Sequence, residues 1–176
     1  MSFVEAKTAS VVYRKPALAD AAAIHALIDE CQPLDLNSKY AYMLLCTHFA
    51  DTCAVAEREG SVVGFVSAYR KPNDHSVLFV WQVAVSERGR GQGVGKGLLE
   101  EILTRPEQAA VRNLEATISP SNRPSWALFE SFARKRGAKC ASQTLFREED
   151  FGSQEHEEEQ LLRIGPFESP RGTHQG

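Results

Sequence analysis

Apolar and polar residues alternate along several short segments of the chain, which is typical of strands that bury one face. Residues 111–118 give the clearest example. Their apolar face holds Leu114, Ala116 and Ile118, and their polar face holds Asn113, Glu115 and Thr117. The same pattern, with turn residues between the segments, predicts strands over 11–15, 52–58, 61–69, 76–85, 140–146 and 160–164.

Apolar residues recur at intervals of three and four in other segments, which predicts four helices. The first helix has its apolar face on Leu18, Ala21, Ile24, Ile28 and Cys31. The second spans 40–49 with its face on Ala41, Leu44, Leu45 and His48. The third follows a glycine-rich loop and ends near Pro106, and the fourth spans 122–136 and stops near Gly137. Strands that alternate with helices, with a tight turn at Glu59-Gly60, predict an α/β sandwich with a mixed sheet.

The composition limits the class of protein. A chain of 176 residues with 43% hydrophobic residues has the size of one compact domain. The net charge of −3 gives no reason to expect a nucleic-acid partner. The chain has no run of about 18 apolar residues that would span a membrane. Residues 1–15 lack the apolar core of a signal peptide, so we expect a cytoplasmic protein.

The cysteines and histidines show no pattern of a metal site or a disulfide framework. Cys31, Cys46, Cys53 and Cys140 have no C-x-x-C spacing, so we interpret them as thiols of a reducing compartment. The histidines are scattered over positions 25, 48, 75, 156 and 174. We therefore expect no metal cofactor.

The segment RGRGQGVGKG, residues 88–97, is the strongest functional motif. It follows the apolar run 79–85 and precedes the helical segment 98–103. Glycines let main-chain N–H groups approach an anion closely, and the start of a helix adds further N–H groups, so the segment predicts a phosphate or pyrophosphate site. A Walker A loop would need Gly at position 90 and Ser or Thr at 97, and the dinucleotide pattern G-x-G-x-x-G fails in every register. A plain glycine-rich hairpin turn is the remaining alternative.

The segment also fits [RQ]-x-x-G-x-[GA], with Arg90, Gly93 and Gly95. In this it resembles the GCN5-related N-acetyltransferases, the GNAT superfamily, and the order of predicted elements resembles that family over residues 11–165. The resemblance implies a mostly antiparallel mixed sheet, with helices on both faces, that splays at the acyl-CoA site. Residues 1–10 are then expected to form an N-terminal arm, and residues 166–176 a flexible tail.

The resemblance implies acetyl-CoA as cosubstrate and a set of contacts to it. These are Val83, Val85, Arg88, Arg90, Gly91, Gln92, Gly93, Val94, Gly95, Lys96, Asn122 and Phe129. The Val83 N–H is expected to face the thioester oxygen. One position departs from the family: Phe129 stands where a tyrosine usually protonates the leaving thiolate. No general acid is assigned, and water, Tyr40 or Tyr42 remain as alternatives.

A closer resemblance lies in residues 33–57, 79–85, 114–122 and 156–164, which are similar to the L-2,4-diaminobutyrate acetyltransferases of ectoine biosynthesis. It implies transfer of an acetyl group to the γ-amine, a role under osmotic stress, and a homodimer by analogy. Acetylation of another cationic amine, such as a polyamine, an aminoglycoside or a peptide N-terminus, is the alternative among enzymes. A non-catalytic acetyl-CoA-binding protein is the alternative of another class, suggested by Phe129.

A diamine with one carboxylate requires acidic side chains for its ammonium groups and donors for the carboxylate. The candidates for substrate contact are Asp35, Leu36, Tyr40, Trp81, Glu115, Thr117, His156 and Glu157. Glu115 is also the candidate general base, directly or through water.

Structural alternatives stand beside four of these candidates. Asp35 would cap the second helix, although Asn37 or Ser38 is better placed for that. Trp81 would pack in the core, and Glu115 with Thr117 would form an exposed face of the sheet.

Overall fold

The computed structural model describes residues 10–168, and almost all of the expected arm and most of the expected tail lie outside this range. The strands form one seven-stranded sheet in the order β1-β2-β3-β4-β5-β7-β6. β4 and β5 are parallel, whereas β1–β2, β2–β3, β5–β7 and β6–β7 are antiparallel. The predicted mixed α/β fold is confirmed.

The chain divides into two compact units. Among the described residues, the first holds 10–66 together with 83–101, and the second holds 67–82 and 102–168. β3 (Ser61–Lys71) and β4 (Asp74–Val85) contribute residues to both. The other elements of the first unit are β1 (Val12–Arg14), α1 (Ala21–Glu30), α2 (Lys39–Thr47), β2 (Ala54–Arg58) and most of α3 (Val94–Leu103).

Helices cover both faces of the sheet in the first unit. α1 and α2 form a buried cluster with Val55 of β2 and Phe65 of β3. α3 lies on the other face, because a Cβ at Gly64 would stand 2.9 Å from a side-chain carbon of Val94 and 3.1 Å from one of Leu98. The close contact at Gly64 explains why β3 has no side chain there.

The second helix shows one difference from the expected pattern. Its buried face consists of Tyr42, Leu45 and Cys46, whereas His48, which we placed on that face, is exposed. The Tyr42 ring stands edge-on to His25 and to Phe65, so an aromatic residue takes the central core position. The predicted face was right at Leu45 and wrong at His48, and it left out Tyr42.

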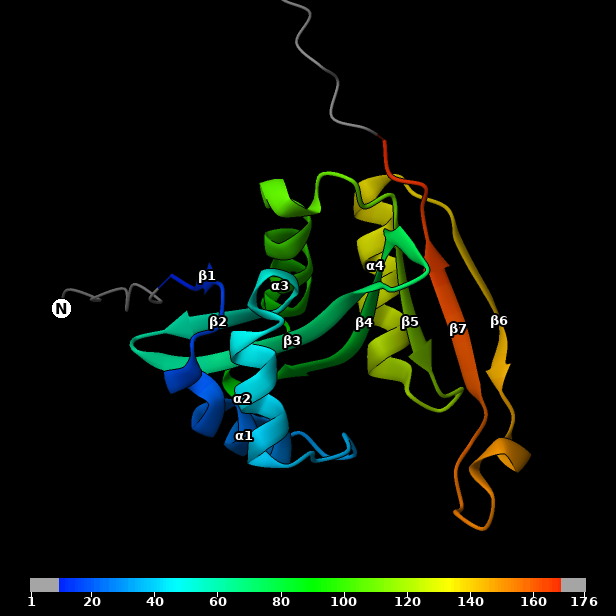
Figure 1. Ribbon diagram of the computed structural model, residues 1–176, viewed down its shortest axis with the longest axis horizontal. Coiled ribbons are helices and arrows are strands. Elements are labelled where there is room, and N and C mark those ends of the chain that lie inside the picture. Colours follow the sequence, from blue (N-terminus) through cyan, green and yellow to red (C-terminus); the bar gives the residue numbers. More distant parts are fainter. Residues whose placement is uncertain (1–9, 169–176) are drawn as a thin grey trace, which may run out of the picture. The chain divides into compact units, whose positions relative to one another are not determined.

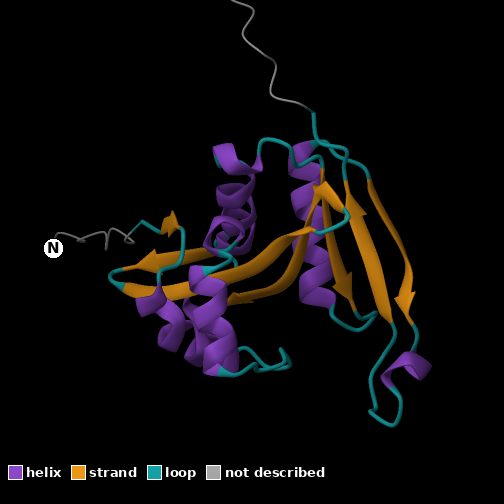
Figure 2. Ribbon diagram, in the orientation of Figure 1, coloured by secondary structure: helices purple, strands orange, loops and turns teal. Residues whose placement is uncertain are grey.

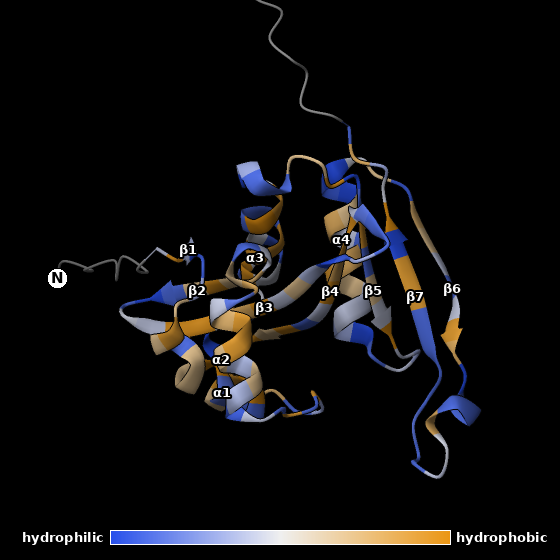
Figure 3. Ribbon diagram, in the orientation of Figure 1, coloured by the Kyte–Doolittle hydropathy of each residue, from blue (hydrophilic) through white to orange (hydrophobic). Residues whose placement is uncertain are grey.

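Besides its parts of β3 and β4, the second unit contains strands β5, β7 and β6 beside helix α4 (Figures 1 and 2). Its elements are β5 (Asn113–Ile118), α4 (Arg123–Arg136), β6 (Cys140–Phe146) and β7 (Glu159–Ile164). The Asn122 side chain accepts from the Ser125 N–H at the start of α4, and Gly137 ends the helix with a left-handed φ of 59°. The segment between β6 and β7 is largely hydrophilic (Figure 3).

The packed chain continues beyond the expected domain end at residue 165. The Phe167 ring is 8% exposed, stands edge-on to Phe132 and lies under the guanidinium of Arg136. Its N–H donates to the Arg112 carbonyl over 2.6 Å. The boundary predicted from the Gly- and Pro-rich composition is therefore at least two residues too early.

Candidate active site

The glycine loop lies in the first unit, between the end of β4 and the start of α3. Gly91 and Gly93 have positive φ angles of 72° and 76°, a region that disfavours any residue with a side chain. An added Cβ at either position would meet no heavy atom within 4 Å, so both positions open to solvent. The loop is thus shaped for backbone contact with a ligand.

The start of α3 supplies the donors. The first bond of the helix runs from the Gly97 N–H to the Gly93 carbonyl over 2.9 Å. The N–H groups of Val94, Gly95 and Lys96 precede this bond, as in the first turn of any helix, and have no i−4 acceptor within it. Three such amides with the positive end of the helix dipole fit a diphosphate, which agrees with the predicted acyl-CoA loop.

Arg58, a residue that the sequence analysis missed, braces this loop from the end of β2. Its guanidinium donates to the Arg88 carbonyl over 3.0 Å and to the side-chain oxygen of Gln92. The Gln92 amide in turn donates to the Arg88 carbonyl over 3.0 Å, and the Arg90 Nε donates to the Val85 carbonyl over 3.2 Å. The predicted contacts Gln92 and Arg90 therefore also fix the loop itself.

The parallel ladder between β4 and β5 ends before either strand does. It runs from the pair Val77–Asn113 to the pair Val80–Ala116, but β4 continues to Val85 and β5 to Ile118. The end of the ladder agrees with the expected splay. Directly after it, Trp81 is 48% exposed, so the core-packing alternative for this residue was wrong. Val83 and Val85 are half-buried and alternate with buried residues.

Asn122 and Phe129 both lie on α4, in the second unit. Asn122 is the N-cap of the helix, and Phe129 is 3% exposed. A buried phenylalanine carries no proton to donate. The departure from the tyrosine pattern therefore leaves α4 without a general acid at this position.

Three of the substrate candidates lie in the first unit on an exposed surface. Asp35 and Leu36 follow α1, and Tyr40 is in the first turn of α2. The N-cap of α2 is Ser38, whose hydroxyl accepts from the Ala41 N–H over 3.2 Å, so Asp35 does not have that role. Tyr42, one of the alternative acids, is fully buried, and its hydroxyl accepts from the Asn37 N–H over 3.3 Å.

Glu115 in the second unit is buried and ion-paired, so the structural alternative of an exposed face of the sheet was wrong for this residue. Its side chain is 2% exposed, and its two oxygens accept from Lys71 Nζ at 2.9 Å and from an Arg163 NH group at 2.5 Å. Because both oxygens are held by cations, this arrangement does not support Glu115 as a free general base. Thr117, two residues further along β5, is half-buried.

His156 and Glu157 occupy the segment before β7. Glu157 accepts from the Ser121 N–H over 3.1 Å and from the Ser121 hydroxyl, which ties this segment to the loop before α4. The His156 ring stacks on Phe151 with 4.0 Å between centroids, and its Nδ1 lies 2.6 Å from the Glu157 carbonyl oxygen. The structure thus brings these two candidates together, but as partners of Ser121 and Phe151.

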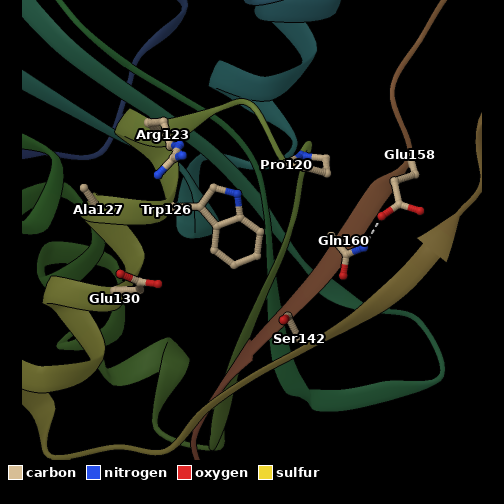
Figure 4. A pocket seen from close by; sticks show the side chains of 8 residues that line it. All are labelled: Pro120, Arg123, Trp126, Ala127, Glu130, Ser142, Glu158 and Gln160. Carbon is tan, nitrogen blue, oxygen red and sulfur yellow. Dashed lines mark hydrogen bonds between the residues drawn. The ribbon is translucent and has the colours of Figure 1, made fainter.

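A hollow of about 670 Å³ lies between α4 and the β6–β7 pair in the same unit (Figure 4). α4 lines it with Arg123, Trp126, Ala127 and Glu130, and the strands and loops line it with Pro120, Ser142, Glu158 and Gln160. The indole N–H of Trp126 donates to the Ser119 carbonyl over 3.1 Å. None of the predicted site residues lines this hollow.

Two absences hold for residues 10–168. No helix there has the length and apolar character needed to cross a membrane. Within the same residues, no three His, Cys, Asp or Glu side chains are grouped so as to hold a metal ion.

Comparison with known proteins gives a consistent assignment. A profile described as the Acetyltransferase (GNAT) family matches residues 21–133. The L-2,4-diaminobutyric acid acetyltransferase of Bordetella parapertussis is 52% identical over 158 residues, which cover 89% of this chain and 85% of the relative. The enzyme of the same name from Halomonas elongata is 48% identical over 157 residues, which cover 89% of this chain and 81% of the relative.

A solved structure is similar along nearly the whole chain. It is the diaminobutyrate acetyltransferase EctA from Paenibacillus lautus, in complex with its substrate L-2,4-diaminobutyric acid and coenzyme A. The TM-score is 0.87 at 42% sequence identity, over 93% of this chain and 99% of that chain.

Proposed function

The chain belongs to the acetyltransferase (GNAT) family, and we propose that it transfers the acetyl group of acetyl-CoA to the γ-amine of L-2,4-diaminobutyrate. The product is N4-acetyl-L-2,4-diaminobutyrate, an intermediate of ectoine biosynthesis. The observation that carries the proposal is the match over almost the full length to EctA of Paenibacillus lautus, whose complex contains this diamine and coenzyme A.

The geometry of the glycine loop supports acetyl-CoA as cosubstrate independently of the comparison with EctA. Gly93 presents an open, positive-φ position directly before the amides of Val94, Gly95 and Lys96, so no side chain separates these amides from a diphosphate. Arg58 holds the loop in that shape from β2. Acetyl-CoA, when bound, supplies an activated acetyl group with a thiolate as leaving group.

The remaining steps fall to the protein. The γ-amine begins protonated, with a pKa near that of lysine, about 10.4, so a proton has to leave before attack. Asp35 of the first unit is proposed to bind an ammonium group of the substrate. Trp81 and Thr117, both of the second unit, are proposed as substrate contacts. The N–H of Val83 is proposed to stabilise the negative charge that develops on the thioester oxygen. Transfer is direct, without an acyl-enzyme.

The assembly and location are part of the same proposal. We infer a homodimer, a cytoplasmic location and a role under osmotic stress. β6 supports the dimer: it is the last strand in the sheet order, all seven of its residues are exposed, and it contains neither a charged residue nor a proline. Edges without these protections pair readily with a second copy. Sedimentation analysis should show a dimer that Leu145→Lys weakens.

The test of the activity is an amine panel. Purified protein is incubated with acetyl-CoA and, separately, L-2,4-diaminobutyrate, putrescine, an aminoglycoside and a peptide, and free thiol release and acetylated products are measured. We expect a strong preference for L-2,4-diaminobutyrate with acetylation at the γ-nitrogen. Preference for any other amine would overturn the proposed substrate, and coenzyme A binding without turnover of any amine would overturn the proposed activity.

A further inference from the structure

Lys71, Glu115 and Arg163 form a charge cluster that the mechanism above does not use. The Glu115 carboxylate is buried and receives one cation on each oxygen, Lys71 at 2.9 Å and Arg163 at 2.5 Å. The cations are less enclosed, with side chains 33% and 45% exposed. A buried carboxylate therefore fixes two cations whose side chains are partly exposed.

The cluster contains two positive charges and one negative charge. Lysine offers three donors and arginine five, and the bonds to Glu115 use only part of this capacity. Asp74 is the other carboxylate in the neighbourhood. Its pKa lies below the usual value, mainly because of hydrogen bonds from Ser76 and to a smaller extent because of Arg163 and Lys71. Asp74 is fully exposed and bonded to Ser76, so it does not close the cluster.

The sheet register places the cluster one row from the end of the β4–β5 ladder. Phe79, Glu115 and Arg163 are direct partners across three strands, so their side chains lie on one face. Two residues further along, Trp81 and Thr117 occupy the next row of this face, where the ladder has ended after Val80–Ala116. The row spacing is about 6.6 Å, two residues at about 3.3 Å each.

From this geometry we infer that Lys71 and Arg163 bind the carboxylate of the amino-acid substrate, with Glu115 as the residue that positions them. The inference rests on the proposed function and names a subsite for its substrate. Four bonds of about 1.5 Å separate the carboxylate carbon of L-2,4-diaminobutyrate from its γ-nitrogen, a reach of about 5 Å when extended. A carboxylate held at the cluster thus brings the γ-amine close to the row of Trp81 and Thr117.

The arrangement also explains why two cations are held together by a buried acid. A carboxylate accepts two donors side by side, and charge-assisted bonds of this kind are about twice as strong as neutral ones. The substrate carboxylate would be the second anion and would balance the cluster. The competing explanation is that the cluster only links β3, β5 and β7 and has no ligand. In that case, substitutions in the cluster should change the affinity for ligands with and without a carboxylate to the same extent.

The experiment compares two ligands that differ in this group. L-2-Aminobutyrate has the carboxylate but no γ-amine, and 1,3-diaminopropane has both amines but no carboxylate. Each is measured as a competitive inhibitor of L-2,4-diaminobutyrate acetylation by the wild type, Arg163→Gln and Lys71→Gln. We expect either variant to raise the inhibition constant of L-2-aminobutyrate about 10- to 100-fold, the factor of one lost charged pair, and that of 1,3-diaminopropane less than about twofold.

The control is Arg147→Gln, which removes an exposed arginine paired with Glu149 and should change neither constant. Circular dichroism and thermal unfolding check that each variant is folded, and Arg163→Lys should recover part of the affinity. Equal changes for both ligands, or no change for either, would overturn the inference. If the wild type does not acetylate the diamine, the proposed function fails, and calorimetric titration of L-2-aminobutyrate into the wild type and Lys71→Gln still decides whether the subsite exists.

Discussion

The glycine loop and the Lys71–Glu115–Arg163 cluster are both suited to anions, but they are built in opposite ways. The loop uses main-chain amides from consecutive residues at the start of α3, with glycines that keep side chains away. The cluster uses side chains from β3, β5 and β7, aligned by the sheet register and oriented by one buried carboxylate. In the proposed roles, local backbone geometry would recognise a group common to every acyl-CoA, whereas assembled side chains would discriminate one acceptor from another.

The largest change in ligand affinity that would test this difference between the loop and the cluster is expected on substitution of Gly93. Gly93→Val should raise the dissociation constant of coenzyme A more than about 100-fold, because a side chain would cover the amides that are proposed to bind the diphosphate, each charged hydrogen bond contributing about 1.5–3 kcal/mol. Isothermal titration calorimetry measures the affinity.

Gly60 provides the matched control for that variant. Its φ is 75°, and an added Cβ would meet no atom within 4 Å, so Gly60→Val imposes the same backbone strain in the β2–β3 turn. Both variants should lose about 1–2 kcal/mol of stability from the left-handed backbone, but only Gly93→Val should lose coenzyme A affinity. Equal affinities for the two variants would contradict the loop assignment.

Asp35→Asn tests the acceptor side of the comparison. We expect about a 30-fold rise in the KM of L-2,4-diaminobutyrate, equivalent to one charged pair, and less than about a twofold change in the KM of acetyl-CoA. Steady-state kinetics with either substrate varied gives both constants. A parallel rise in both would indicate that Asp35 supports the loop after α1 and does not bind the amine.

Arg58→Met should act on the cosubstrate alone. Its two bonds order the loop from outside, so their loss should raise the KM of acetyl-CoA about tenfold while the KM of the diamine stays within about twofold. Arg58→Lys, which keeps the charge but not the two-pronged geometry, should recover little. An unchanged KM for acetyl-CoA would show that the glycines hold the loop without this brace.

The smallest effect on substrate affinity is expected at Asp20. A substitution there should lower the stability of the fold without changing either KM, so it tests whether destabilisation alone could produce the affinity changes predicted above. Arg14 donates to both oxygens of Asp20 at 2.8 and 2.9 Å, and these bonds hold the pKa of Asp20 below its usual value. A depressed carboxylate pKa stabilises the fold above the unfolded-state value of about 3.9, and this stabilisation is lost as the pH falls through the folded pKa.

Asp20→Asn should therefore lower the free energy of unfolding by about 1–2 kcal/mol at pH 7. The difference from the wild type should shrink below about pH 4, where the wild-type carboxyl also becomes neutral. Urea unfolding over a pH series measures this. Neither KM should change, and a difference independent of pH would contradict the ion-pair explanation.

Features set by neighbouring residues could be predicted from the sequence. The strand over 140–146 was predicted at its observed bounds, the turn at Glu59-Gly60 has the positive φ angles it requires, and Asn122 caps α4 as expected. The shape of the glycine loop belongs to the same class, because its glycines and the helix start that follows are consecutive, whereas its binding of a diphosphate stays a prediction.

Features set by strand pairing could not be predicted. Glu115 is 44 residues from Lys71 and 48 from Arg163, and only the strand order β3-β4-β5-β7 brings them together. The burial of Glu115 was missed for the same reason: polar alternation on β5 does not reveal that β3 and β7 each contribute a cation. Arg58 lies 30 residues from Arg88, and the sequence offered no signal that connected the end of β2 to the glycine loop.

The last described residues set a limit on how the protein can be shortened or fused. Phe167 packs against Phe132 and Arg136 of α4, and a Cβ at Gly165 would stand 2.5 Å from the Asn113 side chain. Residues 165–167 therefore fix the chain after β7 to α4 and to the start of β5. A purification tag belongs after Glu168, where the contacts of Phe167 with Phe132 and Arg136 stay intact. A stop codon in place of Phe167 would uncover the aromatic face of α4 and favour aggregation during expression.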